Sequence, residues 1–272
     1  MRVLTMNVFG RRANWPARRR LLREAVRDLD PDLVAFQEVV AIDGYDQAAD
    51  VVGEEMHLLH QRAREPGGPG DVEAGQGISI ASRWPIASSE EIGLEVTPRT
   101  AGFASGALVA TVDAPDPIGL LLFVNHLPDW QLDHEREREL QAVRVATRIE
   151  ELLAERDRHV VLVGDQDADP SAASIRFWTG RRSLEGMSVC YRDAWESARP
   201  GEPGETFSPA NPLLTDPDWP FRRIDYVLVR CAEHGGPTLR IASCGRVLDD
   251  SVEGIWASDH FGLTAVLESR VG

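Results

Sequence analysis

The stretch HVVLVGDQDADP, residues 159–170, decides the fold of this chain. Its β-branched and aliphatic run at 160–163 is typical of a strand that is buried on both faces. Gly164 then lets the backbone turn tightly, and Asp165, Asp167 and Asp169 follow within one turn. Three carboxylates this close repel one another unless a cation or hydrogen-bond donors lie beside them. The alternative is an ordinary acidic turn, because Asp also favours turns and helix N-caps.

The composition is that of a soluble globular protein, with 27% charged and 43% hydrophobic residues in a chain of 272. A net charge of −15 argues against broad phosphate neutralisation of nucleic acid, which needs surplus Lys and Arg. A local metal site would still let an acidic protein cut nucleic acid. No repeat or linker divides the chain, so we expect one domain over residues 1–272.

The cysteines Cys190, Cys231 and Cys244 show no metal-type pairing, and their odd number fits a reducing compartment. We expect buried, inert thiols. No signal-peptide core is present, and no apolar run approaches about 18 residues. We therefore expect no membrane segment, take the cytoplasm as the default location, and expect a monomer.

Hydrophobic periodicity predicts a mixture of helices and strands. Predicted strands cover 2–8, 32–38, 78–81, 86–92, 107–113, 119–125, 160–163, 224–229, 239–242 and 261–267, and predicted helices cover 15–30, weakly 43–53, 134–156 and 172–179. The Gly- and Pro-rich segment 64–77 predicts a mobile surface loop. The arginines of the first helix favour a solvated face over contact with phosphate.

Several predicted strands end in a side chain that can bind a metal or a phosphate. Asn7, Glu38, His126 and Asp165 each follow an apolar run, and a Ser-Asp-His sequence follows at 258–260. Strand ends gather at one edge of a sheet in layered α/β proteins, and sites are usually found there. Any one of these residues alone favours a turn, a cap or a satisfied histidine. All five together predict a functional site.

The donor set is rich in oxygen and lacks cysteine, so its natural cation is hard. Mg²⁺ or Mn²⁺ would be held by Glu38, Asp259 and the amide oxygen of Asn7. Mg²⁺ keeps several waters and prefers to share its shell with a substrate phosphate. This preference points to phosphoryl chemistry.

Six short motifs occur in order: MNV at 6–8, QE at 37–38, NHL at 125–127, GDQD at 164–167, RIDYV at 223–227 and SDH at 258–260. As an ordered set they resemble the endonuclease/exonuclease/phosphatase superfamily from residue 3 to residue 267. The resemblance implies an α/β (α+β) fold in which two stacked mixed β-sheets form a four-layer αββα sandwich.

The resemblance also implies roles for individual residues. Asn7, Glu38 and Asp259 would hold the metal, with a second divalent cation sometimes bound near Asp165 and Asp167. Asp165 would orient or deprotonate the attacking water.

The resemblance implies that two histidines act as hydrogen-bond donors. His126 and His260 would donate to the phosphoryl oxygens, and Asp225 would accept from His260, fixing its tautomer and favouring its imidazolium form. Arg223 is either a surface arginine or a phosphate contact. Trp130 and Trp219 lie in predicted loops beside the motifs, where they could stack on the substrate, whereas core packing accounts for most tryptophans.

The sequence departs from the family pattern at Asp167, a catalytic and substrate-binding position where the usual residue is Asn. An amide NH₂ donates to a phosphoryl oxygen, whereas an ionised carboxylate repels it. Three explanations stay open: Asp167 is protonated beside Asp165, it binds a second cation, or it faces a less anionic part of the substrate. Gln166 stands where a bulky apolar residue is common, and the sequence gives no physical account of it.

We therefore expect a Mg²⁺-dependent hydrolase of phosphate esters, a phosphodiesterase or phosphatase that acts on a small soluble substrate by in-line attack of water on phosphorus. One alternative is a metal-dependent endonuclease or exonuclease acting on DNA or RNA, with the basic helix at 17–27 as its backbone contact. The other is a non-hydrolytic binding protein on the same scaffold, motivated only by Asp167.

Overall fold

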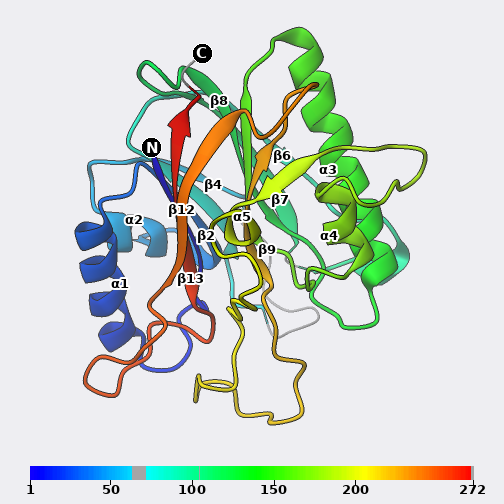
Figure 1. The fold of residues 1–272 in the computed structure, drawn as a ribbon. Coiled ribbons are helices and arrows are strands. Elements are labelled where there is room, and N and C mark those ends of the chain that lie inside the picture. The colour runs from blue at the N-terminus through cyan, green and yellow to red at the C-terminus, as the bar shows by residue number, and fades with distance from the viewer. Residues whose placement is uncertain (63–71, 104, 271–272) are drawn as a thin grey trace.

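The computed structural model describes residues 1–62, 72–103 and 105–270. Two β-sheets pack face to face, and helices cover their outer faces (Figure 1). Among the described residues, seven strands form the first sheet and six form the second. The predicted four-layer sandwich is confirmed.

The first sheet has the strand order β12-β13-β1-β2-β5-β4, with the short β3 paired to β2. Its strands are β1 (Arg2–Asn7), β2 (Leu33–Ile42), β3 (Tyr45–Asp46), β4 (His57–His60), β5 (Gln76–Ser82), β12 (Leu239–Val247) and β13 (Gly262–Ser269). β1 runs parallel to β2 and antiparallel to β13. The first and last strands of the fold are therefore neighbours.

The second sheet has the order β10-β11-β9-β8-β7-β6. Its strands are β6 (Ile86–Ile92), β7 (Gly106–Asp113), β8 (Leu120–Leu127), β9 (His159–Asp165), β10 (Tyr191–Asp193) and β11 (Asp225–Arg230). Only the β8–β9 pairing in it is parallel among the described residues, so the sheet is mixed, as the first one is.

The helices form the outer layers. α1 (Trp15–Leu29) and α2 (Gln47–Val52) pack on the first sheet, and α3 (Glu135–Glu155) and α4 (Ala173–Trp178) pack on the second. The short α5 (Ala194–Ala198) contacts β11 and β12, and the 3₁₀ turn η1 spans Pro98–Thr100. In α1, Leu22 and Val26 lie on one face and pack with Leu4 and Phe36 of the sheet.

Strand alternation divides the core into three layers. Val161 and Val163 of β9 lie in the cluster between the sheets, whereas Val160 and Leu162 pack under α3 and α4. All four side chains are fully buried, as the run at 160–163 predicted. Burying each such side chain contributes about 1.5–3 kcal/mol, so β9 stabilises both faces of its sheet.

The predicted elements differ from the structure mainly in short segments. The segment 43–53, predicted as a weak helix, contains the short strand β3 before α2. The strands β4 and β10 and the helix α5 were not predicted, because they are too short to show periodicity. The strand predicted at 239–242 extends to Val247. A register shift after Ile241 breaks its alternation, which hides the second half of the strand from a pattern with a period of two. In the predicted loop 64–77, residues 64–71 lie outside the described residues and 76–77 belong to β5.

Among the described residues, no helix has the length and apolar character needed to cross a membrane.

Candidate active site

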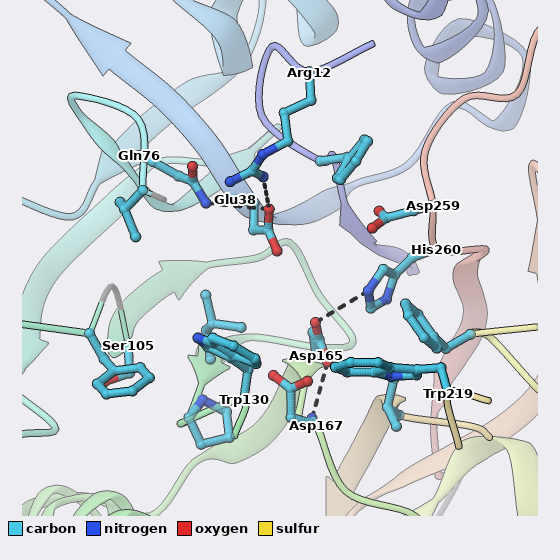
Figure 2. Close-up of a pocket in the computed structure, with 17 residues that line it drawn as sticks. Arg12, Glu38, Gln76, Ser105, Trp130, Asp165, Asp167, Trp219, Asp259 and His260 are labelled. Carbon is cyan, nitrogen blue, oxygen red and sulfur yellow. Dashed lines mark hydrogen bonds and ion pairs between the residues drawn. The ribbon is translucent and has the colours of Figure 1, made fainter. Parts of the chain in front are cut away.

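A cavity of about 280 Å³ lies where β1 and β9 end and β11 begins (Figure 2). Four carboxylates line it, those of Glu38, Asp165, Asp167 and Asp259, together with the ring of His260. These residues come from three separate motifs of the sequence. The structure therefore brings most of the predicted site residues together.

Strand alternation explains which side chains reach the cavity. Val161 and Val163 face the opposite sheet, so Asp165, two residues further along β9, faces it as well. The same alternation turns Asn7 of β1 and Asp225 of β11 inward. Asn7 Nδ2 donates to Asp165 Oδ2 at 3.0 Å, which joins the two sheets across the site.

Gly164 is required by close packing between neighbouring strands. Its φ is +134°, and a Cβ atom at this position would lie 2.2 Å from the carbonyl oxygen of His126. Any other residue would push β9 away from β8 and displace Asp165.

Glu38 reaches the cavity through an irregularity in β2. The register of β2 with β5 shifts between Phe36 and Val39, and Glu38 has a φ of +51°. A left-handed conformation at a residue other than Gly costs about 1–3 kcal/mol and is found mainly at functional sites. The bulge turns Glu38 toward the site, where it accepts hydrogen bonds from Asn7 (3.2 Å), Arg12 (2.7 Å) and Gln76 (3.3 Å).

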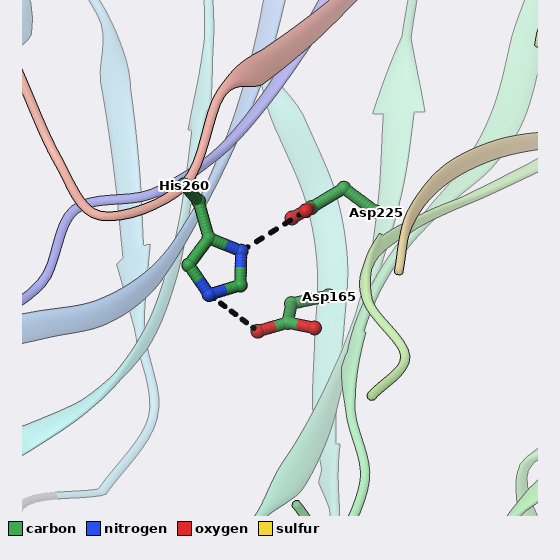
Figure 3. A group of neighbouring side chains, drawn as sticks. All are labelled: Asp165, Asp225 and His260. Atoms are coloured by element: carbon green, nitrogen blue, oxygen red, sulfur yellow. Dashed lines mark hydrogen bonds and ion pairs between the residues drawn. The ribbon is translucent and has the colours of Figure 1, made fainter. Parts of the chain in front are cut away.

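His260 lies between two aspartates (Figure 3). Its Nδ1 is 3.0 Å from Asp225 Oδ2, and its Nε2 is 3.7 Å from Asp165 Oδ2. Burial alone would lower the pKa of His260, but the charges of Asp225 and Asp165 outweigh burial and raise it well above its ordinary value. The two aspartates therefore favour the imidazolium form of His260.

The carboxylates carry more negative charge than their surroundings balance. Burial, and then the neighbouring Asp167, raise the pKa of Asp165 well above its ordinary value. Burial also raises the pKa of Asp259 to about 6, and the charge of Glu38 adds to this effect although His260 opposes it. A buried group of carboxylate oxygens with excess negative charge fits a hard divalent cation. Asp165, Asp225 and His260 could also share one ion, since their ligand atoms lie within 4.8 Å of one another.

Asn7 presents its NH₂ group to the carboxylates. Nδ2 donates to Glu38 and Asp165, while Oδ1 accepts from the backbone N–H of Phe9 at 3.0 Å. Metal binding by the amide oxygen therefore requires a half-turn of the side-chain amide.

The structure places His126 outside the cavity, contrary to its expected contact with phosphoryl oxygens. In β8 the side chains of Asn125 and His126 point to opposite faces of the sheet, so the ring of His126 lies beneath α4. It packs edge-on against Trp178, with ring centroids 6.1 Å apart. His126 Nδ1 bonds Gln166 Oε1 and Gln166 Nε2 donates to the His126 carbonyl oxygen, both at 2.9 Å. Gln166 thus has a structural role that the sequence did not reveal.

Asn125 takes the inward position instead. It accepts from Gln37 at 2.7 Å and donates to the carbonyl oxygens of Phe36 and Ser79, both at 2.9 Å. These bonds tie β8 to the bulged part of β2 beneath Glu38. Asn125 and Gln37 stand in the NHL and QE motifs, and the alternation of LLLFVNHL could have identified Asn125 as inward-facing.

Arg223 is neither a surface arginine nor a phosphate contact. It is 5% exposed, forms an ion pair with Asp193 at 2.7 Å and lies over the ring of Tyr226 at 4.6 Å. Its neighbour Arg222 is nearer the site and donates to the carbonyl oxygen of Asp167 at 3.0 Å.

Aromatic side chains form much of the cavity wall. Trp130 and Trp219 both line it, and so do Phe9, Phe103 and Phe207, which the sequence had not indicated. These phenylalanines come from loops and have no motif of their own, so only the tertiary fold brings them together.

The arginines of α1 do not form a free basic face. Arg18 is buried and donates to the carbonyl oxygens of Val8, Gly10 and Ala257 at 2.8–2.9 Å, and burial lowers its pKa to about 10. It therefore fixes the loops that carry the first and last motifs. On the surface, Arg19 pairs with Asp50 and Arg20 with Glu253, at 3.0 and 2.9 Å.

The sequence pattern of the Endonuclease/Exonuclease/phosphatase family matches residues 4–260, which include every residue of the cavity. The chain belongs to this family. Its members are divalent-metal-dependent hydrolases of phosphate esters. Among curated proteins, none matches this chain.

Solved structures show the same family fold at low sequence identity. D. rerio TDP2 complexed with single strand DNA product is 20% identical, with 99% of each chain covered and a TM-score of 0.76. The human nocturnin catalytic domain with bound sulfate is 15% identical, with 99% of this chain and 93% of that chain covered and a TM-score of 0.74. A Bacteroides vulgatus family member is 18% identical, with 99% and 98% covered and a TM-score of 0.71.

Proposed function

We propose that this chain hydrolyses phosphate esters of a small soluble substrate by in-line attack of water on phosphorus, with a divalent metal ion. One observation carries the proposal: Asp165 and His260, whose ring is held from behind by Asp225, share a cavity with Glu38 and Asp259. Membership of the family supports it.

Glu38 and Asp259 would hold the cation, Mg²⁺ or Mn²⁺, together with Asn7 after the half-turn of its amide. When bound, the ion supplies positive charge to the phosphoryl oxygens. The excess negative charge of the carboxylates supports this assignment.

Asp165 is the base in this proposal. Burial raises its pKa, so its carboxylate binds a proton from the attacking water more readily than an exposed aspartate would. The 3.7 Å between Asp165 Oδ2 and His260 Nε2 is too long for a good hydrogen bond. It leaves Nε2 available to a substrate oxygen beside the base.

His260 donates from Nε2 to a phosphoryl oxygen as negative charge builds in the transition state. Asp225 accepts from Nδ1 and so keeps the ring charged and oriented. Neither side chain needs to move during the reaction.

A small substrate is favoured by the size of the cavity and by the net charge of the protein. The cavity of about 280 Å³ is at the lower end of ligand pockets. The net charge of −15 repels long polyanions.

A nuclease is the second candidate. D. rerio TDP2, a structure of similar fold, was solved with a single strand DNA product. Trp130 and Trp219 also offer rings on which bases could stack.

Hydrolysis of an aryl phosphomonoester, an aryl phosphodiester and plasmid DNA, each with Mg²⁺, Mn²⁺ or EDTA, tests these candidates. We expect metal-dependent release of the aryl alcohol, abolished in Asp165→Asn and retained in Asp157→Asn, which removes an exposed charge at the other end of β9. DNA nicking alone would favour the nuclease. Inactivity on all three substrates would leave the non-hydrolytic binding protein.

A further inference from the structure

Asp167 places a carboxylate in the cavity. Its backbone N–H donates to Asp165 Oδ1 at 3.1 Å, and its carbonyl oxygen accepts from Arg222. Within 1–62, 72–103 and 105–270, no hydrogen bond or ion pair reaches its side-chain oxygens. Asp167 is half-buried, so its carboxylate is open to a molecule bound in the cavity.

The backbone fixes the direction of this carboxylate. Asp167 has a φ of +49°, and the preceding Gln166 is locked to His126 by two hydrogen bonds. The Gln166 N–H also donates to the carbonyl oxygen of Ile224 at 2.8 Å. A strained residue held this firmly is typical of a binding position.

Two tryptophans flank Asp167. In Figure 2 its carboxylate lies between the rings of Trp130 and Trp219 at the same end of the cavity. Trp130 packs against Phe103 and Trp219 against Phe207, each with ring centroids 6.2 Å apart. Aromatic faces attract cations, and a ring pair with a carboxylate is a typical site for an ammonium group.

We propose that the substrate is a phosphate ester whose alcohol carries an ammonium or quaternary ammonium group, and that Asp167, Trp130 and Trp219 bind this cation. The inference rests on the proposed hydrolase function and names its substrate class. It also explains why a carboxylate stands where an amide would bind a phosphoryl oxygen.

The charges in and around the cavity favour such a substrate. Arg12 is already paired with Glu38, and a divalent ion at Glu38 and Asp259 would balance the charges of those two carboxylates and not that of Asp167. A diester with one ammonium group is a zwitterion, so the net charge of −15 does not repel it as it repels a polyanion. The phosphate would face the metal ligands while the ammonium group faces Asp167.

Two chromogenic diesters of equal shape test the proposal. The p-nitrophenyl phosphodiesters of choline and of 3,3-dimethylbutanol differ in one atom, a charged nitrogen or a neutral carbon, and both release p-nitrophenolate when water attacks phosphorus. With Mg²⁺ we expect the wild type to prefer the choline ester by about tenfold in kcat/KM.

The preference should depend on Asp167. In Asp167→Asn we expect the ratio of the two kcat/KM values to fall close to one, and a ratio cancels any change in rate that both esters share. Asp169→Asn removes a charge two residues away, outside the cavity, and should keep the wild-type ratio. Equal rates on both esters, or an unchanged ratio in Asp167→Asn, would overturn the inference while the hydrolase function stands.

Titration with tetramethylammonium separates the cation site from catalysis. Saturable binding to the wild type that is lost in Asp167→Asn supports the site, even if neither ester is hydrolysed and the proposed function fails. Absence of binding would refute it. Displacement of bound tetramethylammonium from the wild type by a second Mg²⁺ equivalent would instead identify Asp167 as a metal ligand and overturn the inference.

Discussion

The imidazole of His260 is held by Asp225 through a buried contact of 3.0 Å between Nδ1 and Oδ2. Asp225 is fully buried at the start of β11, directly opposite Asp165 of β9 in the strand register. The pairing of two strands thus sets the distance between the proposed base and the charged histidine.

Replacing Asp225 by Asn should reduce kcat by about 10²-fold or more, because Asn cannot stabilise the imidazolium. Asp225 raises the pKa of His260, so its loss lowers that pKa. Activity that requires the charged ring would then be lost at a lower pH, and the alkaline limb of the pH–kcat/KM profile should shift to lower pH. An unshifted alkaline limb would contradict the proposed role of His260.

Replacing Asp259 by Asn should affect stability in opposite directions with and without metal. Burial and then the charge of Glu38 penalise the ionised carboxylate, so in EDTA we expect the variant to be more stable by about 1 kcal/mol. In Mg²⁺ the variant should gain less stability than the wild type, because a ligand is missing. Thermal unfolding in both buffers measures this, and an equal Mg²⁺ response would exclude Asp259 as a ligand.

His126 should make the fold sensitive to acid. Burial lowers its pKa to about 4, although the hydrogen bond with Gln166 opposes the shift. The unfolded chain, with an ordinary histidine pKa, binds the proton more tightly, so stability is full above about pH 6.5 and falls as the pH drops toward 4. The loss should approach about 3 kcal/mol below pH 4.

Urea unfolding of wild type and His126→Asn between pH 7 and pH 4 measures this contribution. The difference in unfolding free energy between the two proteins should change in favour of the variant as the pH falls. A difference that stays constant with pH would mean that His126 is not buried in its neutral form.

Gln166→Met should loosen the loop that carries Asp165 and Asp167. Methionine has a similar shape but leaves the His126 ring and carbonyl oxygen without their partners, which costs about 1–3 kcal/mol. We expect a lower unfolding free energy together with a reduced kcat. A double-mutant cycle with His126→Phe should give a coupling energy of about 0.5–3 kcal/mol. Strictly additive losses of unfolding free energy would show that Gln166 and His126 do not stabilise each other.

Much of the fold and of the site could be predicted from the sequence, because buried strands followed by ligand-type residues determine both. Asp165, Asp225 and His260 were expected together and lie together. Their catalytic roles stay predictions. The burial of both faces of β9 could be predicted because its four apolar residues at 160–163 are consecutive.

Other features depended on backbone details that the sequence does not display. His126 and Asn125 are adjacent in one motif, and only the facing of β8 decides which enters the site. Glu38 reaches the cavity through a bulge, and Arg222 rather than Arg223 lies near Asp167. In each case a shift of one residue exchanges an inward side chain for an outward one.

The pairing of β1 with β13 bears on how the protein is made. Ser258 donates to the carbonyl oxygen of Asn7 at 2.7 Å, so the two ends of the sequence meet beside the reactive groups. A polypeptide still on the ribosome has β1 and β2 exposed but lacks their partner strand and the SDH segment. The proposed site lacks Asp259 and His260 until translation has passed residue 260, so we expect unfinished chains to be inert toward phosphate esters.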